Sequence, residues 1–353
     1  MEVTLIHISA CIIAKNEENK IGSCLKHLKN YVDEIIVVDT GSIDKTKQIA
    51  YEYTDDVYDF SWLDDFSEAR NYSIAKASNE YILIIDCDER IESFDRYKLE
   101  ELIKGNPDKV GRILRRNKYH RGEQSYTYVE RVNRFFPKSS YHYEGSIHEQ
   151  IVSIRNDAIK TYDIPIEADH DGYEGALEQR REKTQRNIHL LLKELGKSPR
   201  DTYLLYQLGK SYYMEEDFLS AYQYFDKALQ EELNIHLEYV QDMMESYGYT
   251  LLNLEEYDTA LQLLNIYDEF SNSADFIFLI GLIFMNNGMF IEAINEFLKA
   301  TKYSIVKMEG VNTYLSYYNI GVIYECLGDK DRARYYYVGC GNYDKARDRL
   351  EQL

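Results

Sequence analysis

Two aspartates separated by one residue, Asp86 and Asp88, follow directly on the apolar run 82–85. A short apolar run of this kind is typical of a parallel strand covered on both faces, and ligands bind beyond the carboxyl ends of such strands. Two carboxylates at that spacing can share a divalent cation, or one can bind the cation while the other binds a ligand hydroxyl. A turn with solvated acids is the alternative, because Asp is common in turns.

The segments before this run predict the elements that must position the two aspartates. Apolar runs at 8–14 and 35–38 each end in polar residues, and helical patterns follow both of them. A short strand is expected at 56–59, and a helix from Asp65 to about Ala77. Strands alternating with helices indicate a mainly parallel sheet with right-handed crossovers. Polar side chains then gather at one sheet edge, namely Asn16, Glu17, Asp39, Asp86 and Asp88.

No glycine-rich phosphate loop follows the first strand, so neither a dinucleotide fold nor a P-loop is indicated. An edge built from acids repels a diphosphate unless a metal ion neutralises the charge. The edge therefore predicts a nucleotide held together with Mn²⁺ or Mg²⁺.

Four motifs carry a specific resemblance, and their order is that of family-2 glycosyltransferases of the GT-A fold. They are Ile12-Ile-Ala-Lys-Asn-Glu-Glu18, Val38-Asp-Thr-Gly-Ser-Ile-Asp-Lys-Thr46, Asp65-Phe-Ser-Glu-Ala-Arg-Asn71 and Ile85-Asp-Cys-Asp-Glu89. The resemblance covers roughly the first 175 residues. It implies a nucleotide-sugar donor, a divalent cation and inversion at the anomeric carbon.

The resemblance also implies roles for single residues. Asp39 contacts the base, Arg70 lies near the nucleotide, Asp86 contacts the ribose or sugar, and Asp88 holds the metal. Each residue has a second interpretation: Asp39 caps the turn, Arg70 pairs on the surface with Glu68 or Asp65, and Asn16 and Glu17 are loop residues. Two arginines further on, Arg131 and Arg134, are candidates for the donor diphosphate because a guanidinium binds phosphate with a fixed fork. Strand alternation predicts that only one of the two faces the donor.

Inverting transfer also needs a carboxylate that removes the acceptor proton. The family often places it near a QxxRW motif, which is absent here, so Glu149 in the pair His148-Glu149 is the candidate base. His148 is expected to orient the base or the donor. His170, expected beyond the last strand in the segment 168–173, is a candidate to complete the metal shell. A structural role is the alternative for either histidine.

The second half of the chain reads as helices. Residues 176–200 are interpreted as a linker helix, and 201–353 as a repeat domain after a catalytic domain at 1–175. Four glycines are each followed twelve residues later by an alanine, at 209/221, 248/260, 281/293 and 321/333. Apolar or aromatic residues recur three positions after each glycine and four after each alanine. This pattern resembles the tetratricopeptide repeat, a helix-turn-helix unit that stacks into a solenoid. The predicted fold class is therefore α/β followed by all-α.

Composition limits the partners. The formal charge of −20 and a pI near 4.9 disfavour nucleic acid or an anionic membrane as the main partner. The longest apolar stretch, 276–285, is too short to span a bilayer. The start of the chain does not resemble a secretory signal, and five scattered cysteines favour reduced thiols, so a cytoplasmic location is expected.

The pairing of both halves resembles a subgroup of bacterial family-2 enzymes acting on bacteriocin peptides and flagellin. It implies transfer of a hexose or N-acetylhexosamine from a UDP-type donor to a Cys, Ser or Thr side chain held by the repeats. Two alternatives are an enzyme building capsule or lipopolysaccharide sugar chains, and an inactive repeat scaffold. The repeats are also candidates for binding a second copy of the chain. Sugar, acceptor and linking atom are not determined by the sequence.

Overall fold

The computed structural model describes residues 6–121, 124–170 and 177–353. The chain forms two compact units, Met1–Arg180 and Arg181–Leu353, which are described separately. The expected boundary between residues 175 and 176, and residues 171–173 of the second histidine segment, lie outside the described residues.

The first unit begins with four parallel strands, as the alternating pattern predicts. They are β1 (Ile8–Ala14), β2 (Glu34–Asp39), β3 (Val57–Asp59) and β4 (Tyr81–Ile84), and they lie in the order β3-β2-β1-β4. The crossovers contain α1 (Ile21–Leu28), α2 (Thr46–Ala50) and α3 (Phe66–Lys76). Asp65 caps α3, since its carboxylate accepts from the backbone N–H of Glu68 at 3.1 Å.

The rest of the sheet is mixed in direction. It consists of β5 (Glu89–Phe94), β6 (Val110–Arg121), β7 (Gln124–Pro137) and β10 (Thr161–His170), with α4 (Arg96–Gly105) between β5 and β6. The sheet continues β4-β7-β6-β10-β5, with β6 parallel to β10 and the other pairs antiparallel. A separate hairpin is formed by β8 (Tyr141–Glu144) and β9 (Gln150–Ser153). The predicted class of this half is confirmed as a mainly parallel, GT-A-like sheet.

One local prediction differs from the structure, and it concerns the end of β10. His170 was expected beyond the last strand, but it is the final residue of β10. Pairing with β6 on one side and β5 on the other extends β10 to this position.

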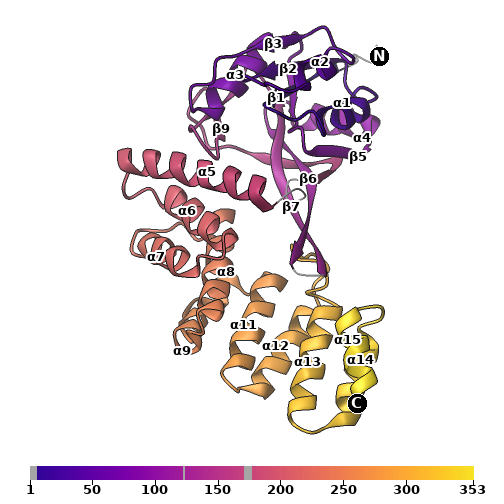
Figure 1. Cartoon of the computed structure of the whole chain (residues 1–353), viewed down its shortest axis with the longest axis vertical. Helices are drawn as coiled ribbons and strands as arrows, with labels where there is room; N and C mark the ends of the chain where they lie inside the picture. Colours follow the sequence, from indigo (N-terminus) through magenta and orange to yellow (C-terminus); the bar gives the residue numbers. More distant parts are fainter. Residues whose placement is uncertain (1–5, 122–123, 171–176) are drawn as a thin grey trace. The chain divides into compact units, whose positions relative to one another are not determined.

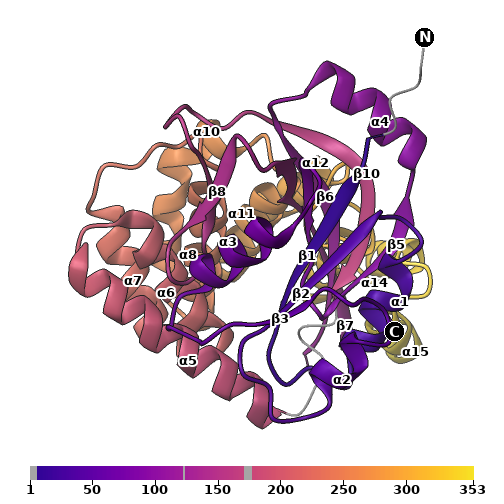
Figure 2. The same ribbon diagram turned by 90° about the horizontal axis from the view of Figure 1, so that it is seen from above.

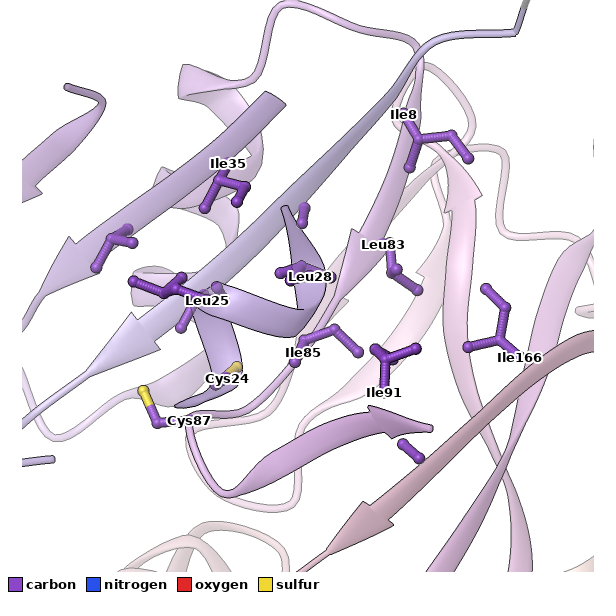
Figure 3. Close-up of a cluster of buried hydrophobic side chains, with 14 of the residues drawn as sticks. Ile8, Cys24, Leu25, Leu28, Ile35, Leu83, Ile85, Cys87, Ile91 and Ile166 are labelled. Carbon is purple, nitrogen blue, oxygen red and sulfur yellow. The ribbon is translucent and has the colours of Figure 1, made fainter. Parts of the chain in front are cut away.

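The sheet is covered on both faces, because successive side chains of the central strands point to opposite sides. Ile12 of β1 belongs to a cluster that includes Leu25 and Leu28 of α1, whereas Cys11 packs with Ile74 of α3. Figure 3 shows the first cluster, in which side chains of α1 lie over Leu83 of β4. Figure 2 shows the strands of this unit from above, with α3 beside them. Both layers hold the carboxyl ends of the strands in place.

The second unit is helical. Its elements are α5 (Leu177–Lys197, which begins in the first unit), α6 (Thr202–Met214), α7 (Phe218–Leu229), α8 (Glu238–Asn253), α9 (Tyr257–Ala260), a 3-10 turn (Leu261–Ile266), α10 (Tyr267–Phe270), α11 (Ala274–Asn286), α12 (Phe290–Ala300), α13 (Tyr314–Cys326), α14 (Lys330–Gly339) and α15 (Asp344–Gln352). Helix pairs α6/α7, α11/α12 and α13/α14 pack as hairpins, and α12 lies beside α13 (Figure 1). Among the described residues, no helix is long and apolar enough to cross a membrane.

The glycines of the repeat pattern are contact points between paired helices. A Cβ atom added to Gly209 would lie 2.5 Å from the Phe225 ring, and one added to Gly321 would lie 2.5 Å from Tyr337. The second pair departs from the predicted spacing, since Leu263 and Leu279, and not Leu264, face Gly248. The 3-10 turn after Ala260 changes the helical rotation there, which explains the one-residue shift.

Candidate functional site

The three predicted aspartates lie at the carboxyl ends of strands in one part of the sheet. Asp39 is the last residue of β2, and Asp86 and Asp88 lie in the short turn between the end of β4 at Ile84 and the start of β5 at Glu89. Only β1 separates these strands, and all three run parallel. The crevice beyond the carboxyl ends of parallel strands is where such sheets bind ligands.

Asp39 shapes the loop that follows β2 and also presents an unused acceptor. Its Oδ1 accepts from the backbone N–H groups of Gly41 at 3.0 Å and Ser42 at 2.9 Å, and Gly41 has a positive φ of 102°. Its Oδ2 is buried and has no hydrogen-bond partner among the described residues. A buried acceptor without a partner is costly, so this oxygen is suited to a ligand N–H or O–H.

Asn16 and Glu17 position this same loop. The backbone N–H of Asn16 donates to Ser42 Oγ at 2.9 Å, and its Oδ1 accepts from the backbone N–H of Ile43 at 2.9 Å. The backbone N–H of Glu17 donates to Thr46 Oγ1 at 2.7 Å. Asn16 is exposed, and these bonds tie the loop after β1 to the loop after β2.

Asp86 is held between two buried arginines. Arg70 Nη2 donates to its Oδ1 at 2.8 Å, and Arg134 Nη2 donates to its Oδ2 at 2.6 Å. Burial raises the pKa of the Asp86 carboxyl, but the charges of Arg134 and Arg70 outweigh burial and leave the pKa well below its usual range. Asp86 is therefore a fixed carboxylate at neutral pH.

Arg70 reaches Glu149 as well as Asp86. Its Nε donates to Glu149 Oε1, so one guanidinium joins the loop after β4 to the loop before β9. Arg70 is buried at 6% exposure and is not the surface helix residue of the alternative interpretation. Glu149 follows His148, whose backbone has a positive φ of 49°, and Gly145 opens the same loop with φ 98°. The loop thus brings Glu149 to the arginine cluster.

Three hydrogen-bond donors in this cluster are available to a ligand or to water. Arg70 Nη1, Arg134 Nε and Tyr143 Oη are buried and have no hydrogen-bond partner among the described residues. The Arg70 guanidinium lies 5.6 Å from the centre of the Tyr143 ring. Burial raises the pKa of Tyr143 to about 12, so its hydroxyl stays protonated at neutral pH. These groups can donate to oxygen atoms of a bound sugar or phosphate.

Asp88 and His170 form the candidate metal pair. His170 Nε2 lies 3.6 Å from Asp88 Oδ1, and Lys20 Nζ lies 3.9 Å from Asp88 Oδ2. Within the described ranges, no three His, Cys, Asp or Glu side chains gather as a metal site. A carboxylate with one further ligand fits Mg²⁺ or Mn²⁺, because these ions are commonly completed by substrate phosphates and water. The pair therefore fits a cation that binds together with a diphosphate.

The structure does not bring Arg131 to this cluster. Its Nε lies 3.5 Å from Asp163 of β10, whereas Arg134 contacts Asp86 and Glu89. Strand alternation had predicted that only one of the two arginines faces the site, and Arg134 is that residue.

Further residues complete the cluster: Glu89, which ends the fourth motif but was given no role, and three residues of β6 and β7 that lie outside the motifs. Glu89 is buried at 1% exposure and accepts from Arg134 at 2.8 Å and from Arg115 at 3.0 Å. Arg115 also donates to Glu130 at 2.8 Å, and Glu130 accepts from Asn117 at 2.7 Å. Arg115 and Glu130 are cross-strand partners on β6 and β7. The signal in the sequence is the run of basic residues in β6, which is too rich in charge for an ordinary buried strand.

The N-terminal unit is similar to a known protein family. Residues 9–156 match the model of the family described as glycosyl transferase family 2. Most of the N-terminal unit is thus similar to the family-2 glycosyltransferases, the family that the four motifs resemble.

Two of the curated relatives extend beyond that domain. The chain is 29% identical over 233 residues to a TPR repeat-containing protein of Synechococcus elongatus, covering 64% of this chain and 57% of that protein. It is 28% identical over 232 residues to the SPbeta prophage-derived glycosyltransferase SunS of Bacillus subtilis, covering 63% of this chain and 53% of that protein. The chain therefore spans about half the length of these relatives. A third relative, the lipopolysaccharide core biosynthesis glycosyltransferase LpsC of Rhizobium meliloti, is 31% identical over 114 residues, covering 31% of this chain and 42% of that protein.

Solved helical-repeat structures are similar to half of the chain. The crystal structure of YrrB, described as a TPR protein with an unusual peptide-binding site, matches with a TM-score of 0.41 and 22% identity, covering 50% of this chain and 88% of that chain. A crystal structure of MamA matches with a TM-score of 0.39 and 20% identity, covering 51% of this chain and 99% of that chain.

Proposed function

We propose that the protein is an inverting glycosyltransferase that moves a hexose or N-acetylhexosamine from a nucleotide-sugar donor, with UDP as the expected nucleotide, to a side chain of a polypeptide. The observation that carries this proposal is the convergence of Asp39, Asp86 and Asp88 at the carboxyl ends of neighbouring parallel strands. The family match over residues 9–156 supports the reaction class.

The donor is proposed to lie across this edge. Asp39 Oδ2, the buried acceptor without a partner among the described residues, accepts a hydrogen bond from an N–H group of the base. Asp86 accepts one from a hydroxyl of the ribose or sugar. Asn16 and Glu17 keep the base-side loop in shape through their bonds to residues 42–46. Arg134 and Arg70 both donate hydrogen bonds to Asp86. Their guanidinium groups also place positive charge beside the donor.

A divalent cation, Mn²⁺ or Mg²⁺, is proposed to be held by Asp88 and His170. When bound, it neutralises the diphosphate and so assists departure of the nucleotide. Lys20 near Asp88 adds a positive charge on the same side.

Glu149 is the proposed base that removes the acceptor proton, and His148 precedes it in the same loop. Arg70 binds Oε1 of Glu149, which fixes the direction of the second oxygen, Oε2. Replacing Glu149 with Gln is expected to preserve donor binding and to abolish transfer, measured as modified acceptor against released nucleotide. Unchanged transfer would place the base elsewhere.

The acceptor is proposed to be a Cys, Ser or Thr side chain of a peptide or protein bound by the helical unit. Residues 201–300 contain three Lys or Arg against 18 Asp or Glu, so this part of the chain favours a basic polypeptide. The similarity to SunS extends over 232 residues, more than either unit contains, which is compatible with a shared architecture.

The donor proposal is tested by measuring the affinity of the full chain for UDP-, GDP-, CDP- and dTDP-sugars, with and without Mn²⁺, by calorimetry. One nucleotide sugar is expected to bind, and its binding is expected to need the metal. Asp39→Asn is the matched variant, because its remaining Oδ1 still accepts from Gly41 and Ser42. It is expected to keep the melting temperature and to weaken binding at least about tenfold, the equivalent of one lost hydrogen bond to a charged group. No binding of any donor would reject the proposal and favour a repeat scaffold without activity.

A second candidate acceptor class is a growing sugar chain, as in capsule or lipopolysaccharide synthesis. The similarity of 114 residues to LpsC is the observation that favours it. Incubating the full chain with the donor identified above, and with either a peptide mixture or a saccharide mixture, separates the two classes by mass spectrometry of the products.

A further inference from the structure

Asn117 lies between two strands at the metal side of the site, although no sequence motif includes it. It is 3% exposed in β6, and its register partners are Tyr128 of β7 and His170 of β10. A buried amide must satisfy both its oxygen and its NH₂ group, so its orientation can be deduced from its neighbours.

The neighbours on β7 can only accept hydrogen bonds. Asn117 Nδ2 lies 2.7 Å from Glu130 Oε1 and 3.3 Å from the backbone carbonyl of Tyr128. Glu130 Oε1 also accepts from Arg115 at 2.8 Å, so this oxygen is an acceptor in both contacts. The NH₂ group must therefore face β7, because the flipped amide would set oxygen against two acceptors.

The amide oxygen consequently faces β10. Asn117 Oδ1 lies 2.7 Å from His170 Nδ1, so this ring nitrogen must carry a proton and donate it. In the neutral ring the lone pair is then on Nε2, the atom that lies 3.6 Å from Asp88 Oδ1. Two acceptor atoms that face each other at this distance are stabilised by a cation between them.

We propose that Asn117 is a positioning residue that sets the tautomer of His170 and so makes His170 and Asp88 a divalent-cation site. This inference rests on the proposed function, in which the same cation binds the donor diphosphate. Hydrogen bonds of this kind to the second nitrogen of a ligating histidine fix the ring and raise metal affinity. Glu130, Asn117 and His170 form a chain of hydrogen bonds, here called the relay. They come from three adjacent strands, which give the relay a rigid support.

The test is a titration of the full chain with Mn²⁺ alone and with Mn²⁺ plus UDP, followed by calorimetry or electron paramagnetic resonance. Asn117→Ala removes the acceptor for His170 and is expected to weaken Mn²⁺ binding by about 10–100-fold. Asn117→Asp keeps an acceptor for His170 Nδ1 and is expected to bind Mn²⁺ within a few-fold of the unchanged protein.

The same two variants are expected to follow the opposite order in thermal stability. Asn117→Asp sets a second carboxylate against Glu130 and loses both donor bonds, so it is expected to melt below Asn117→Ala. A residue that only filled space would give the same order in both measurements. His170→Ala defines the lower limit of affinity. Asn106→Ala is the control for the loss of a hydrogen-bonded amide. Both amide atoms of Asn106 are also hydrogen bonded, but Asn106 lies at the C-cap of α4, before β6 begins, and its amide is not hydrogen bonded to His170.

The outcomes separate this inference from the proposed function. If His170→Ala loses Mn²⁺ while both Asn117 variants bind it normally, the relay is rejected and the metal site stands. If Asn117→Asp loses as much affinity as Asn117→Ala, the tautomer role is also rejected. If the unchanged protein binds no Mn²⁺ under either condition, the metal part of the proposed function fails and the relay fails with it.

Discussion

At the scale of residues, the site is a buried network in which arginines and carboxylates alternate. Arg70 is central, because it contacts Asp86 and Glu149 from a third element, α3. Desolvating charges is unfavourable, and the network is stable only while each charge keeps its partners. The stability of the network thus depends on the whole set of pairs more than on any single pair.

Removing Arg70 is expected to destabilise the first unit strongly. Arg70→Met leaves Asp86 and Glu149 buried with one partner fewer, which costs about 3–5 kcal/mol when a buried pair is broken. Trp62 is the chain's one tryptophan and lies in this unit, so its fluorescence during urea unfolding reports the change. Lys47→Met is the control, since the Lys47–Asp59 pair is exposed and such pairs contribute under about 1 kcal/mol. Equal losses in both variants would contradict the network's role.

The pKa of Asp86 predicts how the stability of this unit responds to acid. Because Arg134 and Arg70 hold the pKa below its unfolded value of about 3.9, the carboxylate stabilises the folded state above that pH. This contribution is lost as the pH falls below about 4. The difference in unfolding free energy between the unchanged protein and Asp86→Asn is therefore expected to shrink from pH 5 to pH 3. A difference independent of pH would show that the charge of Asp86 is not stabilising.

At the scale of elements, the helical unit depends on close contacts between paired helices. Gly209 of α6 faces the ring of Phe225 of α7, which is fully buried and has no room to move away. Aspartates cap α6, α7 and α14 at Asp201, Asp217 and Asp329 and set where these helices begin.

Adding a methyl group at this contact is expected to be unfavourable. Gly209→Ala should destabilise the helical unit by about 1–3 kcal/mol through overpacking. Gly196→Ala in α5 is the matched control, since a Cβ there meets no atom within 4 Å and alanine gains up to about 1 kcal/mol of helix propensity. Thermal unfolding followed by circular dichroism measures both. Adding Phe225→Leu to Gly209→Ala should restore part of the loss, and no restoration would place the strain elsewhere.

At the scale of the whole molecule, charge is distributed unevenly along the chain. Of the formal charge of −20, residues 201–300 contribute −15. A surface with this excess attracts cationic partners over roughly a Debye length, about 8 Å at physiological salt. Steering of this kind would act on the proposed polypeptide acceptor without requiring a particular sequence.

Modification of a basic acceptor peptide is therefore expected to depend strongly on salt. Raising NaCl from 50 to 500 mM should increase the KM for a lysine-rich peptide several-fold and leave the KM for the nucleotide sugar less affected. A peptide of equal length with Glu in place of Lys is the control and should be a poor acceptor at every salt concentration. A KM independent of salt would argue against electrostatic recognition of the acceptor.

The amino-acid sequence determined the order of the elements and the identity of the strand-end acids. Apolar runs that end in Asp39 and Asp86 predict where parallel strands stop, because local hydrophobic patterning reflects burial on both faces of a sheet. The spacing of Gly209 and Phe225 likewise predicts a helix pair, since a recurring small residue is needed where two helices approach.

Tertiary structure alone decided which charges meet. Arg115, Glu130 and Asn117 become neighbours of Glu89 and His170 through the register of β6 with β7 and β10, and register depends on pairing between distant segments. The same pairing directs Arg134 to the site and Arg131 to Asp163. Local patterns predict which residues alternate between the two faces of a strand. The partner of each charge is set by the pairing of strands that are distant in the sequence, and no short motif predicts that pairing.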